Sequence, residues 1–303
     1  MKEKPLLTVV TPVSRMSGRL SNLESWLREV SAFKIQVVVI HDKQDEKTGP
    51  ELRAIISQIS NPDIQYGEGV YGNPGAARNA GIHLADSKWI CFWDSDDQPL
   101  VSTFYAMVQL AENSGSEVCI GEFLIRNEFE KTETQNSIFS EDLVINWEKV
   151  ALNPGIWRMA FRQEIFGKTR FANLRMGEDQ LFVATIGIFK KVTLFYPQVV
   201  YRYCVGISSQ LTANKSAISD LVPILLEMRN LLNSRSDKNK TLISLMVARQ
   251  LITLIKRGTS RARISALSIL IGFLLLDLQG KSKVLPSMFR IVSHSRKDRT
   301  GNQ

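Results

Sequence analysis

Residues 73–97, NPGAARNAGIHLADSKWICFWDSDD, decide how the rest of the chain is interpreted. The stretch opens with turn-forming residues, continues as an Ala-rich segment, and runs through the apolar letters WICFW into three clustered aspartates. A proline directly after asparagine is typical of a helix start, and a short apolar run between polar segments is typical of a buried strand. The stretch therefore predicts a helix followed by a buried strand that ends in an acidic loop.

The same alternation extends to both sides of this stretch. Apolar runs at residues 6–13, 35–42 and 116–125 predict further buried strands, and segments with helical spacing lie between the strands. Strands that alternate with helices form a parallel sheet with helices on both faces. The sequence therefore predicts an α/β fold with a mostly parallel sheet flanked by helices.

Polar residues stand where the predicted strands end. Thr11 and Pro12 end the first strand, Asp42 ends the second, and residues 94–97 end the fourth. In open parallel sheets ligands bind at this edge, near the point where the strand order reverses. The start of the Ala-rich helix, with Arg78 one turn in, also offers backbone N–H groups to an anion. These positions therefore form a candidate binding site.

The acidic loop has the chemistry of a divalent metal site. Asp94, Asp96 and Asp97 lie within four residues, and clustered carboxylates repel one another unless positive charge neutralises them. Oxygen ligands suit Mg²⁺ or Mn²⁺, and Mg²⁺ usually combines one or two carboxylates with substrate phosphate oxygens. The alternative is a solvated acidic turn that caps the next helix. The apolar strand before the loop favours the metal site.

A second acidic pair, Glu178 and Asp179, lies in GEDQLF (residues 177–182) at the predicted start of another helix. Negative charge at a helix N-terminus complements the helix dipole by about 0.3–1 kcal/mol, and this ordinary role needs no catalytic partner. The helix-dipole role alone does not explain why a second acidic cluster lies upstream.

Four segments carry a family resemblance: VVTPVS, VVVIHD, NPGAARNAGIHLADSKWICFWDSDD and GEDQLF. In order and spacing they resemble the family 2 glycosyltransferases, inverting enzymes of the GT-A fold that use nucleotide-diphospho-sugars. The resemblance covers roughly residues 5–212, one domain in length, and is most specific over residues 73–97. It implies a Rossmann-like GT-A sheet, a Mg²⁺ or Mn²⁺ ion, a nucleotide-sugar donor such as a UDP-sugar, and a glycan or lipid-linked acceptor. Bacterial surface-polysaccharide assembly is the setting that it implies.

The resemblance also assigns roles to individual residues. Thr11 and Pro12 lie beside the nucleotide, Asp42 contacts the base, and Arg78 lies near the nucleotide. Asp179 is the catalytic base with Glu178 beside it. The Asp-x-Asp motif and its neighbour supply the remaining donor and metal contacts, with Asp96 nearest the metal: Asp94, Ser95, Asp96 and Asp97.

Two departures from the family pattern refine this interpretation. The letters HDKQD (residues 41–45) stand where the family often has Asp-Asp-Gly-Ser, which affects the turn geometry and the base contacts. The Gln-x-x-Arg-Trp motif of processive synthases does not follow Asp179. The resemblance therefore favours a transferase that adds a single sugar.

Two segments of the predicted catalytic domain have weaker patterns. Residues 128–148 are polar and irregular, which predicts a loop or lid. Residues 192–205, VTLFYPQVVYRYCV, are apolar and β-branched with a proline inside, which predicts two strands separated at Pro197.

Beyond residue 213 the pattern becomes helical and basic. We predict a nucleotide-sugar-binding and catalytic domain at residues 1–213 and a helical basic C-terminal region at residues 214–303. Residues 264–278, ISALSILIGFLLLDL, carry no charge before Asp277. This uncharged stretch is too short for a membrane span, which needs about 20 residues. A buried or an interfacial helix is favoured instead. The basic flanks allow peripheral contact with an anionic membrane, and a solvated helix face is the alternative for the basic residues.

Composition sets the remaining expectations. The chain has 303 residues, a net charge of +8, and three cysteines without the spacing of a disulfide framework or a zinc site. We expect buried thiols in a cytoplasmic protein that touches the inner face of the plasma membrane.

Two other functions are open to the sequence. A sugar-phosphate nucleotidyltransferase would need a Gly-rich signature after the first strand, where TPVSRMSGR contains only Gly18. A non-catalytic module that binds nucleic acid or membrane through the basic tail is the other. Phe273 and Phe289 are the only Phe, Tyr or Trp residues after Tyr203. The basic region therefore offers few side chains that could stack on nucleic-acid bases, and we expect no nucleic-acid partner.

Overall fold

A computed structural model describes residues 4–139, 145–206, 215–234 and 239–300 of the chain. The chain forms two compact units. Unit 1 contains Met1–Ile145, Gly155–Leu174 and Lys191–Ser208, and unit 2 contains Asn146–Pro154, Arg175–Lys190 and Ser209–Gln303. The domain boundary expected at residue 213 stays a prediction, since the short segment Arg175–Lys190 belongs with the C-terminal helices in this division.

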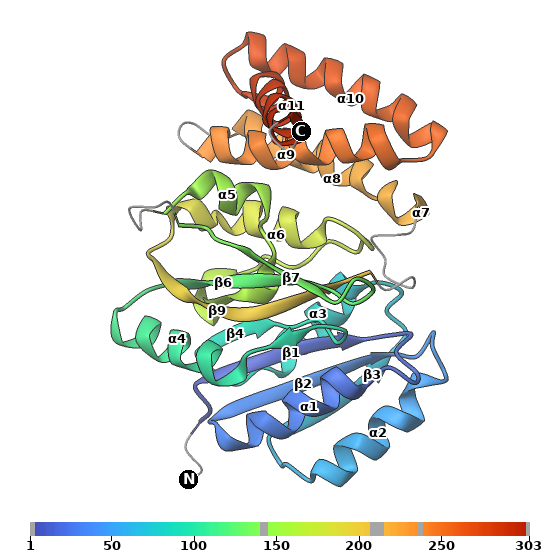
Figure 1. The fold of residues 1–303 in the computed structure, drawn as a ribbon, viewed down its shortest axis with the longest axis vertical. Coiled ribbons are helices and arrows are strands. Elements are labelled where there is room, and N and C mark those ends of the chain that lie inside the picture. Colours follow the sequence, from blue (N-terminus) through green and yellow to red (C-terminus); the bar gives the residue numbers. More distant parts are fainter. Residues whose placement is uncertain (1–3, 140–144, 207–214, 235–238, 301–303) are drawn as a thin grey trace. The chain divides into compact units, whose positions relative to one another are not determined.

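Unit 1 is built on a mixed sheet with the order β3-β2-β1-β4-β8-β6-β9-β5, and β7 pairs with β6 (Figure 1). The strands in chain order are β1 (Leu7–Val13), β2 (Ile35–Asp42), β3 (Ile64–Gly69), β4 (Trp89–Phe92), β5 (Gln98–Pro99), β6 (Val118–Asn127), β7 (Thr132–Asn136), β8 (Met159–Arg162) and β9 (Thr193–Val205).

The first four strands run parallel to one another, with Val9 of β1 opposite Val37 of β2 and Cys91 of β4. The chain moves outward from β1 to β3 and then returns to place β4 on the other side of β1. The strand order therefore reverses between β1 and β4, which is where ligands bind in such sheets. The predicted α/β fold is confirmed, and the antiparallel strand β8 beside β4 makes the sheet mixed.

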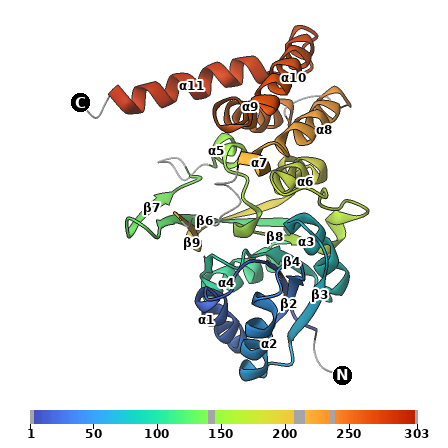
Figure 2. The same ribbon diagram turned by 90° about the vertical axis from the view of Figure 1, so that its right-hand side faces the viewer.

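Helices cover both faces of this sheet (Figure 2). They are α1 (Ser21–Glu29), α2 (Thr48–Ile59), α3 (Pro74–Leu84) and α4 (Val101–Asn113). Helices α1, α2 and α4 share one apolar core with alternate residues of β1 and β2, such as Val9 and Val37. Helix α3 packs on β1 and β2, and a Cβ atom at Gly81 would come within 2.3 Å of Val10 Cγ1. Glycine at this position lets α3 lie close to β1, next to the point where the strand order reverses.

Two weakly patterned segments differ from the prediction. The polar segment expected to be a loop contains β7, which pairs antiparallel with β6. The apolar segment around Pro197 is one strand, β9, and not two: its pairing with β6 shifts register between Gly121 and Glu122, where Tyr196 and Val199 are the successive partners. A proline cannot donate to the ladder, and the bulge leaves Pro197 outside the register.

Unit 2 is helical. It contains α5 (Trp147–Leu152), α6 (Glu178–Ile186), α7 (Lys215–Ile218), α8 (Leu221–Ser234), α9 (Asn239–Arg257), α10 (Ser260–Leu278) and α11 (Val284–Thr300). Helix α9 is central, since α5, α8, α10 and α11 all pack against it, while α6 packs on α8. No helix in the described part of the chain combines the length and the hydropathy of a membrane span.

The three cysteines are free and buried, as expected. Burial raises the pKa of the Cys91 and Cys119 thiols and raises that of Cys204 to about 12. Such thiols are protonated and chemically inert at neutral pH.

Candidate functional site

The ends of β1 and β4 are joined by a side chain. Thr11 is fully buried, and its Oγ1 donates a hydrogen bond of 2.6 Å to the backbone carbonyl of Trp93, the residue that follows β4. Pro12, next to it, is partly exposed. The hydroxyl of Thr11 therefore fixes the geometry of this edge, and the predicted contacts of Thr11 and Pro12 with a nucleotide stay predictions.

The acidic turn (residues 94–97) follows directly. Arg78, from the second turn of α3, donates to Asp94 Oδ1 at 2.7 Å, and its side chain is only 6% exposed. The guanidinium also lies 5.5 Å from the ring centroid of Phe171. A buried arginine needs a counter-charge, so this ion pair holds Asp94 in place. It also brings together two residues that the sequence had assigned to one site.

Asp97 occupies the buried side of the acidic turn. Its Oδ1 accepts a 2.8 Å hydrogen bond from the backbone N–H of Cys204, and the Tyr201 hydroxyl also donates to this carboxyl group. Its Oδ2 is buried and has no hydrogen-bond partner among the described residues. Burial, and then repulsion from Asp96 and Asp94, raises the pKa of Asp97 well above its usual range. Burial and two neighbouring carboxylates therefore disfavour a negative charge on Asp97 unless positive charge is brought to the turn.

Tyr201 connects two parts of the acidic turn. Its hydroxyl accepts from the Asp94 backbone N–H at 3.1 Å and donates to Asp97. Its ring is fully buried and stacks on Trp157 with centroids 4.8 Å apart, and Tyr203 stacks on the same indole at 5.2 Å. Tyr201 is not predictable from the sequence, because nothing in the local pattern at residue 201 points to an aspartate about a hundred positions away.

A divalent cation fits the acidic turn. Asp94 and Asp96 are both partly exposed, whereas Ser95 and Asp97 are buried. Mg²⁺ and Mn²⁺ prefer oxygen ligands, and such an ion would offset the burial and the repulsion from Asp96 and Asp94 that raise the pKa of Asp97. Within the described residues no three His, Cys, Asp or Glu side chains are arranged to hold a metal alone. The fit therefore requires phosphate oxygens from a substrate to complete the shell.

Asp42 organises the loop between β3 and α3. Its Oδ1 accepts from the backbone N–H groups of Tyr71 (3.1 Å) and Gln44 (3.2 Å), and its Oδ2 accepts from that of Gly72 (2.8 Å). Carboxylates that accept several backbone hydrogen bonds are fixed in position. The structure thus shows how Asp42 shapes the loop, and its predicted contact with a nucleotide base stays a prediction.

Two asparagines, one that caps α3 and one within it, hold the segment that follows β8. Asn73 caps the helix, since its Oδ1 accepts from the Ala76 N–H at 2.9 Å, and its Nδ2 donates to Asn173. Asn79 makes a two-bond contact with the backbone of Phe171: its Nδ2 donates to the carbonyl and its Oδ1 accepts from the N–H, both at 2.9 Å. These contacts explain how Phe171 comes to lie beside Arg78.

In unit 2, the second acidic pair begins α6. Gly177 precedes the helix with a φ of +84°, a conformation that favours glycine, and an added Cβ would come within 3.0 Å of Leu221. Glu178 is buried, while Asp179 is partly exposed, and Asp179 Oδ1 accepts from the Gln180 N–H at 2.8 Å. Both carboxylates thus lie at the positive end of the helix dipole, as predicted.

A bidentate ion pair fixes the chain just before α6. Arg175 Nε and Nη2 each donate to a different carboxylate oxygen of Asp220 at 2.9 Å, and the Arg175 backbone N–H donates to Asp220 Oδ2 at 3.0 Å. The Gln250 side chain of α9 donates to that of Gln180 at 2.7 Å. Unit 2 therefore fixes both the approach to Asp179 and the residue that follows it.

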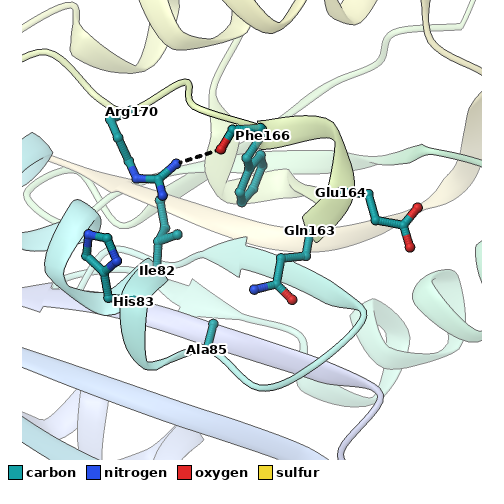
Figure 3. Close-up of a pocket in the computed structure, with 8 residues that line it drawn as sticks. Ile82, His83, Ala85, Gln163, Glu164, Phe166 and Arg170 are labelled. Carbon is teal, nitrogen blue, oxygen red and sulfur yellow. Dashed lines mark hydrogen bonds between the residues drawn. The ribbon is translucent and has the colours of Figure 1, made fainter.

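A shallow pocket lies at the other end of α3 (Figure 3). It is lined by Ile82, His83, Ala85, Gln163, Glu164, Phe166, Gly167 and Arg170. The Gln163 N–H donates to the carbonyl of Lys88 at 2.8 Å, just before β4 begins. The pocket is therefore at the amino end of β4, whereas the acidic turn is at its carboxyl end, and we leave it out of the candidate site.

Comparison with known proteins places this geometry in context. The family model "Glycosyl transferase family 2" matches residues 19–190, more than half of the 303-residue chain. Glycosyltransferase GlyA of Streptococcus pneumoniae serotype 4 (strain ATCC BAA-334 / TIGR4) is 22% identical over 216 residues. This alignment covers 65% of the chain but only 30% of GlyA, so the chain spans less than a third of that relative.

Solved structures share the fold at low sequence identity. Staphylococcus aureus TarS 1–349, in complex with UDP-GlcNAc, has a TM-score of 0.67 and 14% identity, covering 87% of this chain and 79% of TarS 1–349. The mannosyltransferase PcManGT from Pyrobaculum calidifontis, in complex with GDP-Man and Mn²⁺, has a TM-score of 0.58 and 13% identity, covering 97% of this chain and 81% of PcManGT. At these identities the likeness shows the GT-A fold.

Proposed function

The chain belongs to glycosyl transferase family 2, and from this premise we propose that it is an inverting, metal-dependent glycosyltransferase. It moves a sugar from a nucleotide-diphospho-sugar, such as a UDP-sugar, to a hydroxyl of a glycan or lipid-linked acceptor. One observation carries the proposal: the acidic turn stands at the carboxyl end of β4, where the strand order reverses, with the buried Arg78 paired to Asp94. The nucleotide-sugars bound to TarS and PcManGT support this class of donor.

The residues of unit 1 bind the donor in this proposal. Asp96 and Asp94 would hold Mg²⁺ or Mn²⁺ together with the diphosphate oxygens, and Asp97 lies buried beside them in the same turn. The bound cation supplies positive charge to the leaving diphosphate. Thr11, Pro12, Asp42, Arg78 and Ser95 line the nucleotide side, and the N-terminus of α3 favours an anion.

Unit 2 supplies the base in this proposal. Asp179 takes the proton from the acceptor hydroxyl as that oxygen bonds to the anomeric carbon and the bond from this carbon to the diphosphate oxygen breaks. The nucleoside diphosphate leaves with its negative charge, and configuration inverts because the attack and the departure occur on opposite faces of the sugar. Glu178 lies beside Asp179 in the sequence and adds to the charge at the start of α6.

A donor-hydrolysis screen tests the proposal. The full chain is incubated with Mn²⁺ and a panel of nucleotide-sugars, and released nucleoside diphosphate is measured with and without EDTA. We expect release from at least one donor and its loss with EDTA. Pyrophosphate release from a nucleoside triphosphate and a sugar phosphate would instead identify a nucleotidyltransferase, and release unaffected by EDTA would refute the metal role.

The acceptor side follows from the same family pattern. We propose that the acceptor belongs to bacterial surface polysaccharide and that the enzyme works in the cytoplasm at the inner face of the plasma membrane. The basic residues beyond residue 213 support this location, because a membrane rich in anionic lipid attracts them. A membrane fraction that contains lipid-linked glycan should then accept radiolabelled sugar, whereas a fraction stripped of lipid should not.

A further inference from the structure

Helix α10 is apolar on two opposite sides. One side packs inside unit 2: Ala262, Ala266, Ile269, Phe273 and Leu276 are buried against neighbouring helices. The opposite side is also apolar and faces outward. A helix that is hydrophobic all round is normally covered on all sides. The outward side of α10 therefore needs a partner outside the described part of the chain.

The outward side forms a continuous stripe. Its members recur every three or four residues, which places them on one face of the helix. The apolar stripe consists of Ile264 (70% exposed), Leu267 (59%), Ile271 (60%), Leu274 (40%), Leu275 (54%) and Leu278 (77%). Scattered exposed apolar residues need no explanation, but a contiguous stripe of this kind marks an interaction surface.

Helix α10 also lies at the outside of unit 2. It packs on α8, α9 and α11, whereas α5 packs on α9 and α6 packs on α8. Both views show α10 at the edge of the helical unit, with α8 and α9 between it and α6 (Figures 1 and 2). The stripe is therefore on a different side of unit 2 from the acidic pair that begins α6.

Both ends of the apolar stripe are cationic. Arg261 and Arg263 are exposed at its start, and Lys283 is exposed just after its end. The single acidic residue between residues 256 and 290 is Asp277, and its carboxylate is used within the unit. Asp277 Oδ1 accepts from the Val284 N–H at 3.1 Å and its Oδ2 from the Leu285 N–H at 2.8 Å, which caps the start of α11.

We propose that α10 lies flat on an anionic lipid bilayer, with the apolar stripe in the headgroup–acyl boundary and the flanking cations on the lipid phosphates. An apolar face bounded by Arg and Lys has this membrane chemistry. A second copy of the chain is the less favoured occupant, because both ends of the stripe are cationic. Any pairing of two stripes would set like charges against each other at the ends. The inference does not depend on the proposed sugar transfer.

Vesicle sedimentation tests this contact directly. The full chain is mixed at low salt with vesicles of phosphatidylcholine alone or with about one third phosphatidylglycerol, and the bound fraction is measured. The apolar part is removed in Leu267→Ser/Ile271→Ser/Leu275→Ser, with Phe129→Ser as control. Phe129 is 86% exposed and lies in unit 1, between β6 and β7. The charge part is removed in Arg261→Gln/Lys283→Gln.

The chain should bind the anionic vesicles, and the triple serine variant should bind at least about tenfold more weakly. The double glutamine variant should lose the preference for anionic lipid, and Phe129→Ser should bind as the parent chain does. Absence of sedimentation at low salt, or equal binding by the triple variant, would overturn the proposal. A concentration-dependent dimer in light scattering that only the triple variant loses would identify a second copy as the partner. Donor hydrolysis without vesicles should be equal in all variants.

Discussion

Two short acidic stretches of this chain have similar composition and are held in different ways. In unit 1, the acidic turn is fixed by groups from distant parts of the sequence: the Arg78 side chain pairs with Asp94, and the Tyr201 hydroxyl and the Cys204 backbone N–H hold Asp97. In unit 2, Asp179 is held at the start of a helix by a backbone N–H. The first arrangement concentrates charge, whereas the second leaves one carboxylate partly exposed at a helix N-terminus.

This difference suggests that the two acidic stretches have different chemical roles. Clustered carboxylates with a raised pKa in their midst suit the binding of a cation and the diphosphate that accompanies it. A single partly exposed carboxylate suits proton transfer, which needs access to a substrate hydroxyl. Changes in unit 1 should therefore alter the binding of donor and metal, and changes at the start of α6 should alter the reaction alone.

The largest effect is expected from Asp179→Asn. Asparagine keeps an Oδ1 for the Gln180 N–H but cannot accept a proton from the acceptor. Turnover in sugar transfer should fall by roughly 10²–10⁴-fold, the usual contribution of a general base. The dissociation constant for UDP with Mn²⁺, measured by calorimetry, should stay within about twofold of the parent value, since no proton transfer occurs on binding.

Loss of nucleotide binding in this variant would refute the assignment of separate roles to the two acidic stretches. So would transfer that survives at more than about a tenth of the parent rate, which is too high for removal of a base. Circular dichroism and thermal unfolding should match the parent chain, which separates lost chemistry from lost structure.

Asp96→Asn should give the next largest effect, and on a different quantity. Loss of a metal-binding carboxylate should weaken Mn²⁺-dependent nucleotide binding by about 10²–10³-fold, equivalent to a few kcal/mol. The matched control is Asp86→Asn, an exposed aspartate before β4. Calorimetry with and without EDTA makes the measurement. If Asp96→Asn binds nucleotide as the parent does in Mn²⁺, the assignment of the metal to the acidic turn is refuted.

Much of unit 1 could be predicted because its signals are local. Parallel strands are recognisable in the sequence as short apolar runs. Polar residues after such runs predicted that Thr11, Asp42 and Asp94 lie toward the carboxyl ends of β1, β2 and β4, and the structure has them there. The segment around Pro197 was harder. A proline favours a strand break, but pairing with β6 on both sides of the bulge outweighs it.

The contacts that shape the candidate site could not be predicted. The bonds from Asn79 to Phe171, from Cys204 to Asp97 and from Arg175 to Asp220 join residues 92, 107 and 45 positions apart. Such hydrogen bonds follow from the completed fold and leave no periodic signal in the chain. The sequence therefore showed which residue types form the site but not how they are held.

Tyr201→Phe should have a smaller effect, on the Mn²⁺ dependence of donor hydrolysis, that shows what positions the acidic turn. Phenylalanine keeps the stacking on Trp157 but removes the hydroxyl between the Asp94 N–H and Asp97. A partner that orients metal ligands typically contributes 10–100-fold, so the half-saturating Mn²⁺ concentration for donor hydrolysis should rise by about tenfold. Tyr203→Phe, which keeps the second ring on the same indole, should leave it unchanged. Equal Mn²⁺ dependence in the two variants would show that the hydroxyl of Tyr201 does not position the turn.

The smallest effect should come from Asp220→Asn in unit 2, and it concerns stability. Burial raises the pKa of Asp220, but hydrogen bonds from Arg175 outweigh it and the net pKa is lowered. A lowered folded-state pKa stabilises the protein above the unfolded value, near 3.9, and this contribution is lost as pH falls through the folded value. Because the Arg175 side chain is 41% exposed, solvent screens the pair and the loss at pH 7 should be under about 1 kcal/mol.

Urea unfolding of the parent chain and of Asp220→Asn measures this difference. It should be constant from pH 7 to about pH 5 and should shrink as the pH falls below about 4, until residue 220 is neutral in both chains below the lowered folded-state pKa. Asp86→Asn removes an exposed pair with Lys4 in unit 1 and should change stability at no pH. A difference between parent and Asp220→Asn that grew as the pH fell would contradict the lowered pKa. It would also remove the argument that the Arg175 ion pair stabilises the approach to α6.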